Sequence, residues 1–384
     1  MKQYLFTVVL TGTVTLVLSW AVWQIALRYK LYPGIRERDV HTTPTPRLGG
    51  VAVFLGIAAS MAVSAGNPYF SIIWSEPQQM IAVLAAMTLT VLVGIADDLW
   101  DLDWFIKLGA QFLAAGIVAG WGQLQIYALP IGGMTVVSGP VGFAISVLVI
   151  VVVMNAVNFI DGLDGLLTGV CLIANAIFFV YSYLLVRDIG ASSYFNLASF
   201  IAATLVGACA GFLPLNWNKA KMFMGDAGAL LIGLLMATSA LAITAQFPTL
   251  SGADFGRTQL LGAFIPILLP IAVVILPLID FGSAVVRRVW AGTSPFSPDR
   301  KHLHHRMLDL GHSDRDAVLI FYAWTAIVGI AVLLMYLATW LGWPGAYWIG
   351  IVYGVIGGAA CLVVTIAPRR HRARTHPIRP EATA

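Results

Sequence analysis

The sequence predicts an all-α polytopic membrane protein, and three observations lead to this fold class. The chain of 384 residues is 59% hydrophobic and only 10% charged, whereas soluble domains carry about 25% charged residues. Its apolar residues form runs that are long enough to cross a bilayer as helices. Its Lys and Arg residues gather in particular loops between those runs, as expected for cytoplasmic loops.

Eleven apolar runs are candidates for transmembrane helices. They cover residues 5–27, 48–66, 79–96, 105–121, 140–157, 166–186, 196–213, 228–246, 259–281, 317–340 and 344–366. No small-residue cleavage site follows a short apolar region in the first run, so we expect a retained span rather than a cleaved signal. Residues 1–367 are expected to form one integral-membrane domain, and the basic residues 368–384 a disordered cytoplasmic tail.

The charge asymmetry predicts the orientation in an inner (plasma) membrane. Of the 22 Lys and Arg residues, all but Lys2, Arg187 and Arg257 fall in the tail, in the loops after the first, seventh and ninth runs, or, in the case of Lys107, shortly after the third run. Because cytoplasmic loops are enriched in cations, we expect the N-terminus outside and the C-terminus in the cytoplasm. One outside loop has β-prone runs around a Pro-Ile-Gly-Gly turn, which predicts a short external hairpin near 124–137.

Four polar clusters, far apart in the sequence, fall at the expected cytoplasmic face. The first contains Asp97, Asp98, Asp101 and Asp103, followed by Lys107. Crowded carboxylates suit a divalent cation or a general base. Capping of a solvated loop accounts for Asp101 and Asp103, but poorly for Asp97 and Asp98, because these two directly follow a long apolar run.

The second cluster, residues 155–169, is the polar stretch around which the chain is organised. Asn155, Asn158, Asp161 and Asp164 are spaced by three, which on a helical end keeps them on one face. The intervening glycines allow a ligand to approach the backbone closely. The alternative is a loop that only caps helices.

In the third cluster, Phe223 lies beside two lysines and Asp226. An acid that opens a span is a good helix cap, and the same set suits an aromatic base, phosphates and a metal. The fourth cluster, 294–306, has three histidines among three cations, which indicates a polyanion. Zinc is the competing interpretation, but no cysteine accompanies the histidines.

Acids for Mg²⁺ together with cations for phosphate favour phosphoryl transfer. Mg²⁺ is favoured over zinc because the acids and carboxamides are hard oxygen ligands. An ion-coupled transporter is the rival class, although its acids would be expected near the bilayer midplane. An intramembrane aspartyl protease is excluded, because Phe223 stands where the GxGD signature requires Gly.

Five motifs resemble a known family over nearly the whole chain. They are Pro46-Arg47-Leu48-Gly49-Gly50, Asp97-Asp98, the NxxNxxDGxDGL stretch from Asn155, Phe223-Met224-Gly225-Asp226 and His302-Leu303-His304-His305-Arg306. The chain resembles the polyprenyl-phosphate N-acetylhexosamine-1-phosphate transferases, the group that contains WecA, TagO and MraY. Leu303 makes the last motif similar to the WecA type, since MraY has three consecutive histidines there.

The resemblance implies a Mg²⁺-dependent glycosyl-1-phosphate transferase, with Mn²⁺ as an alternative cofactor. The implied reaction moves GlcNAc-1-phosphate from UDP-GlcNAc to undecaprenyl or decaprenyl phosphate and releases UMP, as the first membrane step of cell-envelope polysaccharide synthesis. Another UDP-N-acetylhexosamine, or UDP-MurNAc-pentapeptide as in MraY, is the alternative donor. No nucleic-acid partner is implied, and the formation of a homodimer is left open.

The family pattern also implies roles for individual residues. Asp226 and Asn158 match metal ligands, and Arg47 matches a contact to the lipid phosphate. Asp97, Asp98 and Asp161 match catalytic residues, with Asp97 or Asp98 as the base toward the lipid phosphate. The residues that match the nucleotide and sugar-phosphate site are Lys107, Asn155, Leu163, Asp164, Phe223, His302, His304, His305 and Arg306.

Two further expectations concern the reaction and the lipid. We expect the polyprenyl phosphate oxygen to attack the β-phosphorus directly, and a two-step route through an aspartyl phosphate is the rival. The run 259–281 contains three prolines. Prolines kink or break a helix, so we expect a groove for the polyprenyl tail against this run.

Overall fold

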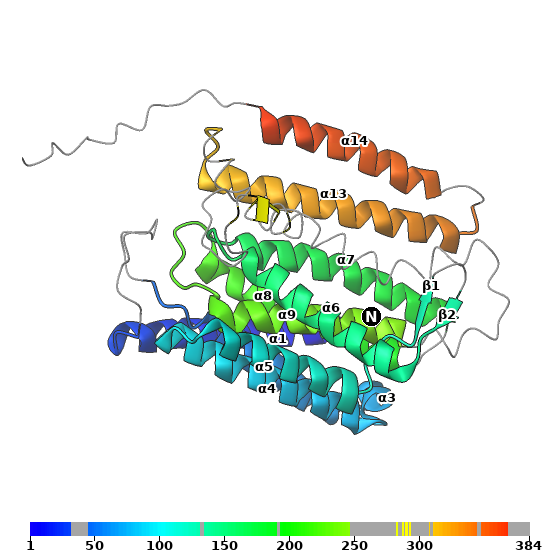
Figure 1. Cartoon of the computed structure of the whole chain (residues 1–384), viewed down its shortest axis with the longest axis horizontal. Coiled ribbons are helices and arrows are strands. Elements are labelled where there is room, and N and C mark those ends of the chain that lie inside the picture. The colour runs from blue at the N-terminus through cyan, green and yellow to red at the C-terminus, as the bar shows by residue number, and fades with distance from the viewer. Residues whose placement is uncertain are drawn as a thin grey trace, which may run out of the picture.

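The computed structural model describes residues 1–31, 45–130, 134–189, 193–245, 310–343 and 347–367, together with a few single residues between 282 and 307. The helices lie side by side in one bundle (Figure 1). They are α1 (Lys2–Arg28), α2 (Gly49–Ala65), α3 (Ser71–Trp74), α4 (Pro77–Trp100), α5 (Trp104–Gly116), α6 (Gly139–Phe159), α7 (Leu166–Ile189), α8 (Ser193–Asn216), α9 (Gly225–Thr244), α13 (Asp314–Trp340) and α14 (Tyr347–Ile366).

Within the described ranges, nine helical stretches are long and apolar enough to cross a membrane, or ten if a bent pair counts as one span. The bent pair is α2 with Pro68–Trp74, which turn through 91°. These ten stretches coincide with ten of the eleven predicted runs, so the all-helical membrane class is confirmed. The remaining run, 259–281, lies outside the described residues, and so does the groove predicted along it.

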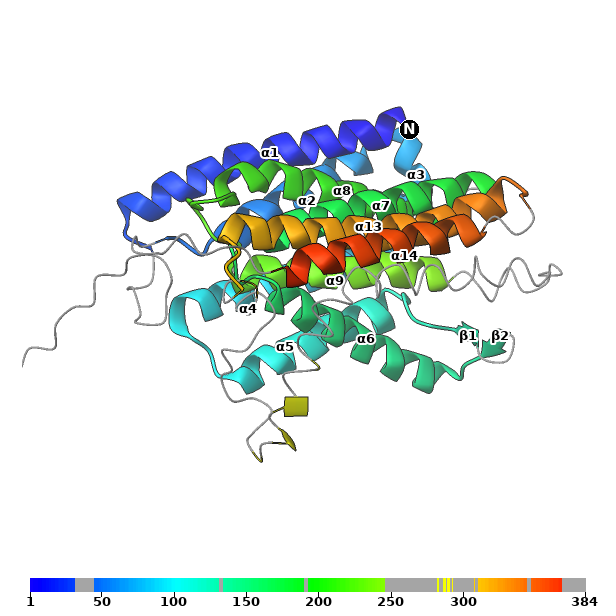
Figure 2. The ribbon, with the colours of Figure 1, turned by 90° about the horizontal axis from the view of Figure 1, so that it is seen from above.

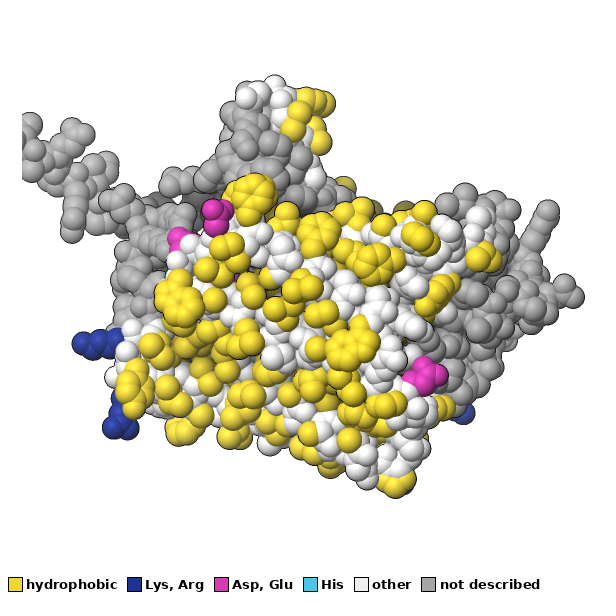
Figure 3. All heavy atoms as spheres, turned by 60° about the horizontal axis from the view of Figure 1, so that its bottom comes forward, with side chains coloured by type: hydrophobic (Ala, Val, Ile, Leu, Met, Phe, Trp, Pro, Cys, Tyr) yellow, Lys and Arg dark blue, Asp and Glu magenta, His cyan; other side chains and the backbone are white. Residues whose placement is uncertain are grey.

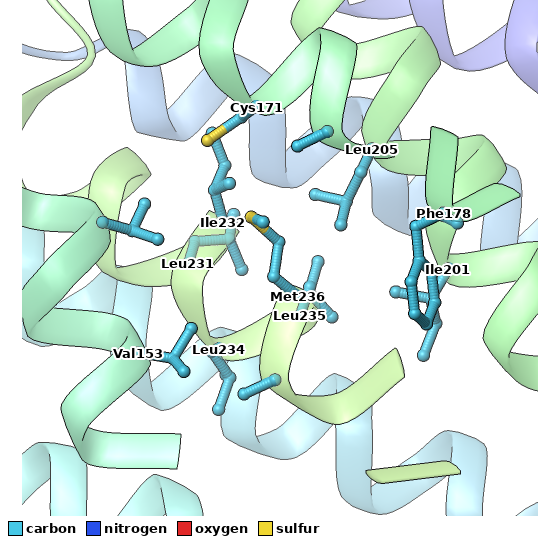
Figure 4. Packing of buried hydrophobic residues seen from close by; sticks show 14 of the residues in the cluster. Val153, Cys171, Phe178, Ile201, Leu205, Leu231, Ile232, Leu234, Leu235 and Met236 are labelled. Atoms are coloured by element: carbon cyan, nitrogen blue, oxygen red, sulfur yellow. The ribbon is translucent and has the colours of Figure 1, made fainter. Parts of the chain in front are cut away.

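Helix α9 forms the centre of the bundle, in contact with α2, α4, α6 and α8. Its side chains Leu231, Leu234 and Leu235 are buried, and Figure 4 shows α9 leucines among side chains from neighbouring helices, such as Val153 and Leu205. A helix that is apolar on every side is expected in such a central position. The first turn of α9 is therefore surrounded by other helices.

The two ends of the bundle differ. Strands β1 (Ala128–Pro130) and β2 (Met134–Val136) pair antiparallel at one end, with Ala128 opposite Val136. This confirms the predicted hairpin, although its tip, 131–133, is outside the described part. Figure 2 shows the start of α1 at the same end as the hairpin, and the end of α14 at the opposite end.

The outer face of the bundle is apolar. Figure 3 shows hydrophobic side chains spread over the described part of one face, while the charged side chains visible there lie toward its ends. Large side chains such as Phe6, Trp20, Leu148 and Ile356 are exposed along the helices. Such a surface is the expected boundary with lipid tails.

Candidate active site

Three helix ends bring charged side chains together at the end of the bundle opposite the hairpin. Lys107, in the first turns of α5, donates from Nζ to Oδ2 of Asp97 at the end of α4, at 3.1 Å. The same Nζ lies 3.8 Å from Oδ2 of Asp226, in the first turn of α9. The structure therefore joins the first and third polar clusters through one ammonium group.

The Pro46–Gly50 segment pairs with the segment before α9 through backbone hydrogen bonds. Phe223 N–H donates to the carbonyl of Pro46 at 2.9 Å, and Gly49 N–H donates to the carbonyl of Phe223 at 3.0 Å. This pairing places the backbones of Arg47 and Phe223 side by side, just before α9 begins. Both side chains are half-buried.

Gly225 shows why this approach needs a residue without a side chain. Its φ is +71°, and a Cβ there would lie 2.1 Å from the carbonyl oxygen of Arg47 and 2.5 Å from Oδ2 of Asp98. An L-residue disfavours that φ, and the space is already taken. The Gly225-Asp226 pair therefore fixes the point at which α9 begins.

Asp161 lies in the turn between α6 and α7. Its N–H donates to the carbonyl of Asn158 at 3.2 Å. Burial and the neighbouring charge of Asp226 raise the pKa of Asp161 to about 7, although the charge of Arg47 acts in the opposite direction. The Asp161 carboxyl therefore lies close enough to Asp226 and Arg47 for their charges to act on it, and a bound cation would favour its ionised form.

The predicted single face of the second cluster is wrong in one respect. Helix α6 ends at Phe159, so the helical spacing holds for Asn155 and Asn158 but not for the two acids that follow. The Asn155 side chain donates to the carbonyl of Val151 at 2.8 Å and to the side chain of Gln111 on α5. Its amide group thus contributes to the contact between α5 and α6.

Asp164 and Asn216 hold the loop that leads to Phe223. Oδ2 of Asp164 accepts a hydrogen bond from Ala220 N–H at 2.9 Å. Asn216 accepts from the Thr168 hydroxyl at 2.7 Å and donates to the carbonyl of Met222 at 3.1 Å. Sequence reasoning missed Asn216 and Thr168. The available signal was a carboxamide at the end of an apolar run, just before the third cluster.

Four predicted residues of the fourth cluster, His302, His304, His305 and Arg306, lie outside the described residues. Leu163 is half-buried in the same turn as Asp161 and packs against the hydrophobic core. Of the described candidates, Asp97, Asp98, Lys107 and Asp226 are joined by the contacts that the structure shows. The acids lie at helix ends rather than in the middle of the bundle.

The side chains at this site show which kind of divalent-cation site they could form. Among the described residues, no group of three or more His, Cys, Asp or Glu side chains is arranged to hold a metal ion. Mg²⁺ usually binds through one or two carboxylates, with waters and substrate phosphates as its other ligands. The Asp226 carboxylate, with the Asp161 carboxyl close enough for the two charges to interact, fits that second pattern and not an all-protein cage.

The chain matches one family model and several named proteins. Residues 80–244 match the model of glycosyl transferase family 4. The chain is 40% identical over 307 residues to a decaprenyl-phosphate N-acetylglucosaminephosphotransferase of Mycolicibacterium smegmatis, covering 79% of this chain and 75% of the relative. It is 28% identical to a probable undecaprenyl-phosphate N-acetylglucosaminyl 1-phosphate transferase of Bacillus subtilis, covering 85% and 83%.

A third relative, the undecaprenyl-phosphate alpha-N-acetylglucosaminyl 1-phosphate transferase of Escherichia coli K12, is 29% identical, with 79% of this chain and 76% of the relative covered. The matches define an integral-membrane transferase. The chain belongs to glycosyl transferase family 4, in the branch of WecA-type polyprenyl-phosphate N-acetylglucosamine-1-phosphate transferases.

Proposed function

We propose that this protein transfers GlcNAc-1-phosphate from UDP-GlcNAc to a polyprenyl phosphate and releases UMP. The observation that carries the proposal is the Lys107 ammonium group, held between Asp97 and Asp226 at the end of a membrane bundle. A cation between carboxylates is suited to a diphosphate that arrives with a metal ion. The names of the relatives supply the acceptor lipid and the sugar.

In the proposed reaction, an oxygen of the polyprenyl phosphate attacks the β-phosphorus of UDP-GlcNAc. A new phosphoanhydride bond forms, the bond to the bridging oxygen of the α-phosphate breaks, and UMP leaves. A phosphate monoester has its second pKa at about 6, so the attacking group is largely ionised at neutral pH. The reaction therefore depends more on positioning and charge neutralisation than on a strong base.

The described residues then take distinct roles. Lys107 orients the diphosphate of the donor, and Phe223 stacks on the uracil. Asp97, whose carboxylate faces Lys107, lies on the side of the lipid phosphate, with Arg47 as the cation that binds that phosphate. Asp164 holds the 216–224 loop in place through Ala220 N–H, so that Phe223 and the turn 161–165 form one nucleotide pocket.

Mg²⁺ is the proposed cofactor, with Mn²⁺ as a substitute. Asp226 and Asn158 would hold it, and Asp161 would add carboxylate charge beside it. The chemistry that a bound Mg²⁺ supplies is neutralisation of charge on the diphosphate and on the departing UMP. Removal of divalent cations with EDTA is expected to stop UMP release, and added Mg²⁺ to restore it.

We place the site on the cytoplasmic face of the plasma membrane. The cations Arg28, Lys30, Lys219 and Lys221 belong to the same end of the bundle as the acids, whereas Lys2 lies at the end of the hairpin. Cytoplasmic loops carry such an excess of cations. Reporter fusions after residues 31 and 367 should give a cytoplasmic signal, and a periplasmic signal from either would contradict this orientation.

The deciding experiment is UMP release by the purified full-length protein. UDP-GlcNAc, UDP-GalNAc and UDP-MurNAc-pentapeptide are each supplied with decaprenyl or undecaprenyl phosphate. We expect release with UDP-GlcNAc and either lipid, with decaprenyl phosphate preferred, because relatives at 40% identity carry that name. Mass spectrometry should then find a polyprenyl diphosphate sugar. Failure to release UMP with any pair would overturn the proposal.

A further inference from the structure

Helix α9 begins at the end of the bundle opposite the hairpin, and the residue before it supplies no side-chain cap. The residue that precedes it, Met224, provides no side-chain hydrogen bond to the first turn. The first backbone N–H groups of a helix have no partner within that helix, and a membrane bundle offers few alternatives. A side chain from another part of the chain can supply a partner for these groups.

Asp98, in the last turn of α4, supplies that partner. Its Oδ1 accepts a hydrogen bond from Asp226 N–H at 3.2 Å, and its Oδ2 accepts one from Ala227 N–H at 3.4 Å. The carboxylate thus spans the first two N–H groups after Gly225. A carboxylate at this position is also favoured by the helix dipole of α9.

The close approach of the α4 and α9 backbones holds the Asp98 carboxylate against the start of α9. A Cβ on Gly94, one turn before Asp98, would lie 2.3 Å from Cα of Ala227. A Cβ on Gly225 would lie 2.5 Å from Oδ2 of Asp98. The two helices therefore meet at backbone distance on either side of the Asp98 carboxylate.

We infer that Asp98 is a positioning residue, which caps α9 from α4 and so directs the Asp226 carboxylate toward Lys107. This inference rests on the proposed function and deepens it. It separates two adjacent acids that the sequence offers as equivalent candidates for a base. Asp97 faces Lys107, whereas both oxygens of Asp98 face the backbone of α9.

The test compares three variants of the full-length protein in detergent. Asp98→Asn keeps an oxygen that can accept an N–H hydrogen bond, whereas Asp98→Ala keeps none. We expect Asp98→Asn to retain kcat for UMP release within about 10-fold, and Asp98→Ala to lose it by about 100-fold and to need about 10-fold more Mg²⁺ for half-maximal rate. Asp97→Asn, the matched control, should lose about 100-fold without such rescue.

Hydrogen exchange gives a readout that does not depend on activity. Asp98→Ala should accelerate exchange of the backbone amides of Asp226 and Ala227, while Asp98→Asn should leave them closer to the wild-type rate. Equal loss of activity in Asp98→Asn and Asp98→Ala, with unchanged exchange in both, would overturn the inference. Absence of UMP release by the wild-type protein would instead overturn the proposed function. In that case the exchange rates would still show whether Asp98 caps α9.

Discussion

Helices α9 and α14 have the same length and are both apolar enough to span a membrane, yet they lie in opposite environments. Each contains 20 residues. In α9, 94% of the apolar stretch is buried, against 11% of the apolar stretch in α14. Figure 1 shows α14 at the edge of the bundle and α9 within it. The helix that carries Asp226 is thus the one that other helices surround.

Small residues distinguish the two helices better than hydropathy does. Lipid tails are as apolar as leucine, so close backbone packing decides which helices are buried. In α9, Gly228 meets Gly50 of α2 and Gly233 meets Met154 of α6. In α14, Gly350 and Gly357 both face α13. Small residues on several sides let α9 pack closely against several helices, so it lies at the centre. Small residues on one side let α14 pack closely against α13 alone, so it lies at the periphery.

The largest effect is expected from Asp226→Asn at the start of α9. The change preserves the shape of the side chain but removes the charge beside Lys107 and the principal proposed metal ligand. UMP release should fall by about 10³-fold or more, as for other groups that stabilise charge in a transition state. A melting temperature near that of wild type would show that the loss is chemical. Activity within 10-fold of wild type would contradict the assignment of this carboxylate.

A smaller but still large effect is expected from Gly50→Ala. The added Cβ would lie 2.2 Å from the backbone nitrogen of Gly228, and backbone atoms cannot rotate away. We expect a loss of about 3 kcal/mol in the free energy of unfolding, measured by thermal melting in detergent.

Gly354→Ala on α14 is the matched control for this substitution. Its Cβ would meet the Cβ of Ala331 at 3.1 Å, a contact between side chains that a shift of a few tenths of an ångström relieves. Equal destabilisation by the two substitutions would mean that α9 is no more tightly enclosed than α14.

Asn216→Ala tests how the loop before α9 is held. The substitution leaves the Thr168 hydroxyl and the Met222 carbonyl without their partner, and each unpaired buried group costs about 1–3 kcal/mol. The control is Asn175→Ala on α7, whose amide donates within its own helix, to the carbonyl of Cys171. Melting temperatures should fall more for Asn216→Ala, and a reversed order would contradict this role.

The carboxyl of Asp161 should contribute to the pH dependence of stability. Its pKa in the folded protein is about 7, well above the ordinary value of 3.8 for an aspartic acid, so the folded state binds a proton that the unfolded state has released. The contribution of this group to the free energy of unfolding is therefore fully present below about pH 4 and is lost as the pH rises from about 4 toward 7. In EDTA, the melting temperature should decline over this range.

Two comparisons sharpen this expectation. Asp161→Asn cannot titrate, so its melting temperature should decline less steeply with pH. Mg²⁺ should flatten the decline in the wild-type protein, because a cation near the acids favours their charged forms. A wild-type decline that neither the substitution nor Mg²⁺ changes would assign the pH dependence to other groups.

The bundle was predictable from the sequence because a bilayer demands long apolar helices. Ten of the eleven predicted runs coincide with described helices or the bent pair. Which helix is central was not predictable, because hydropathy does not separate α9 from α14. The positions of the glycines indicate the central helix only when the partner of each glycine is known, as for Gly50 with Gly228.

The candidate site was predictable in its composition more than in its contacts. Motifs far apart in sequence identified Asp97, Lys107 and Asp226, and the structure brings these three together. The different roles of Asp97 and Asp98 were not predictable, because adjacent residues on a helix point about 100° apart and the sequence does not say which direction meets another helix. Asn216 escaped notice because its partners, Thr168 and Met222, are defined only by folding.

The smallest effect is expected on the outer face of α14. Val363 is 68% exposed in the isolated chain, and lipid should cover it as readily as protein would. Val363→Ala should change the free energy of unfolding by less than about 0.5 kcal/mol, whereas Leu234→Ala in α9 should cost about 2–5 kcal/mol. Thermal melting in one detergent measures both. A cost for Val363→Ala that approaches the cost for Leu234→Ala would show that another protein surface, rather than lipid, covers α14.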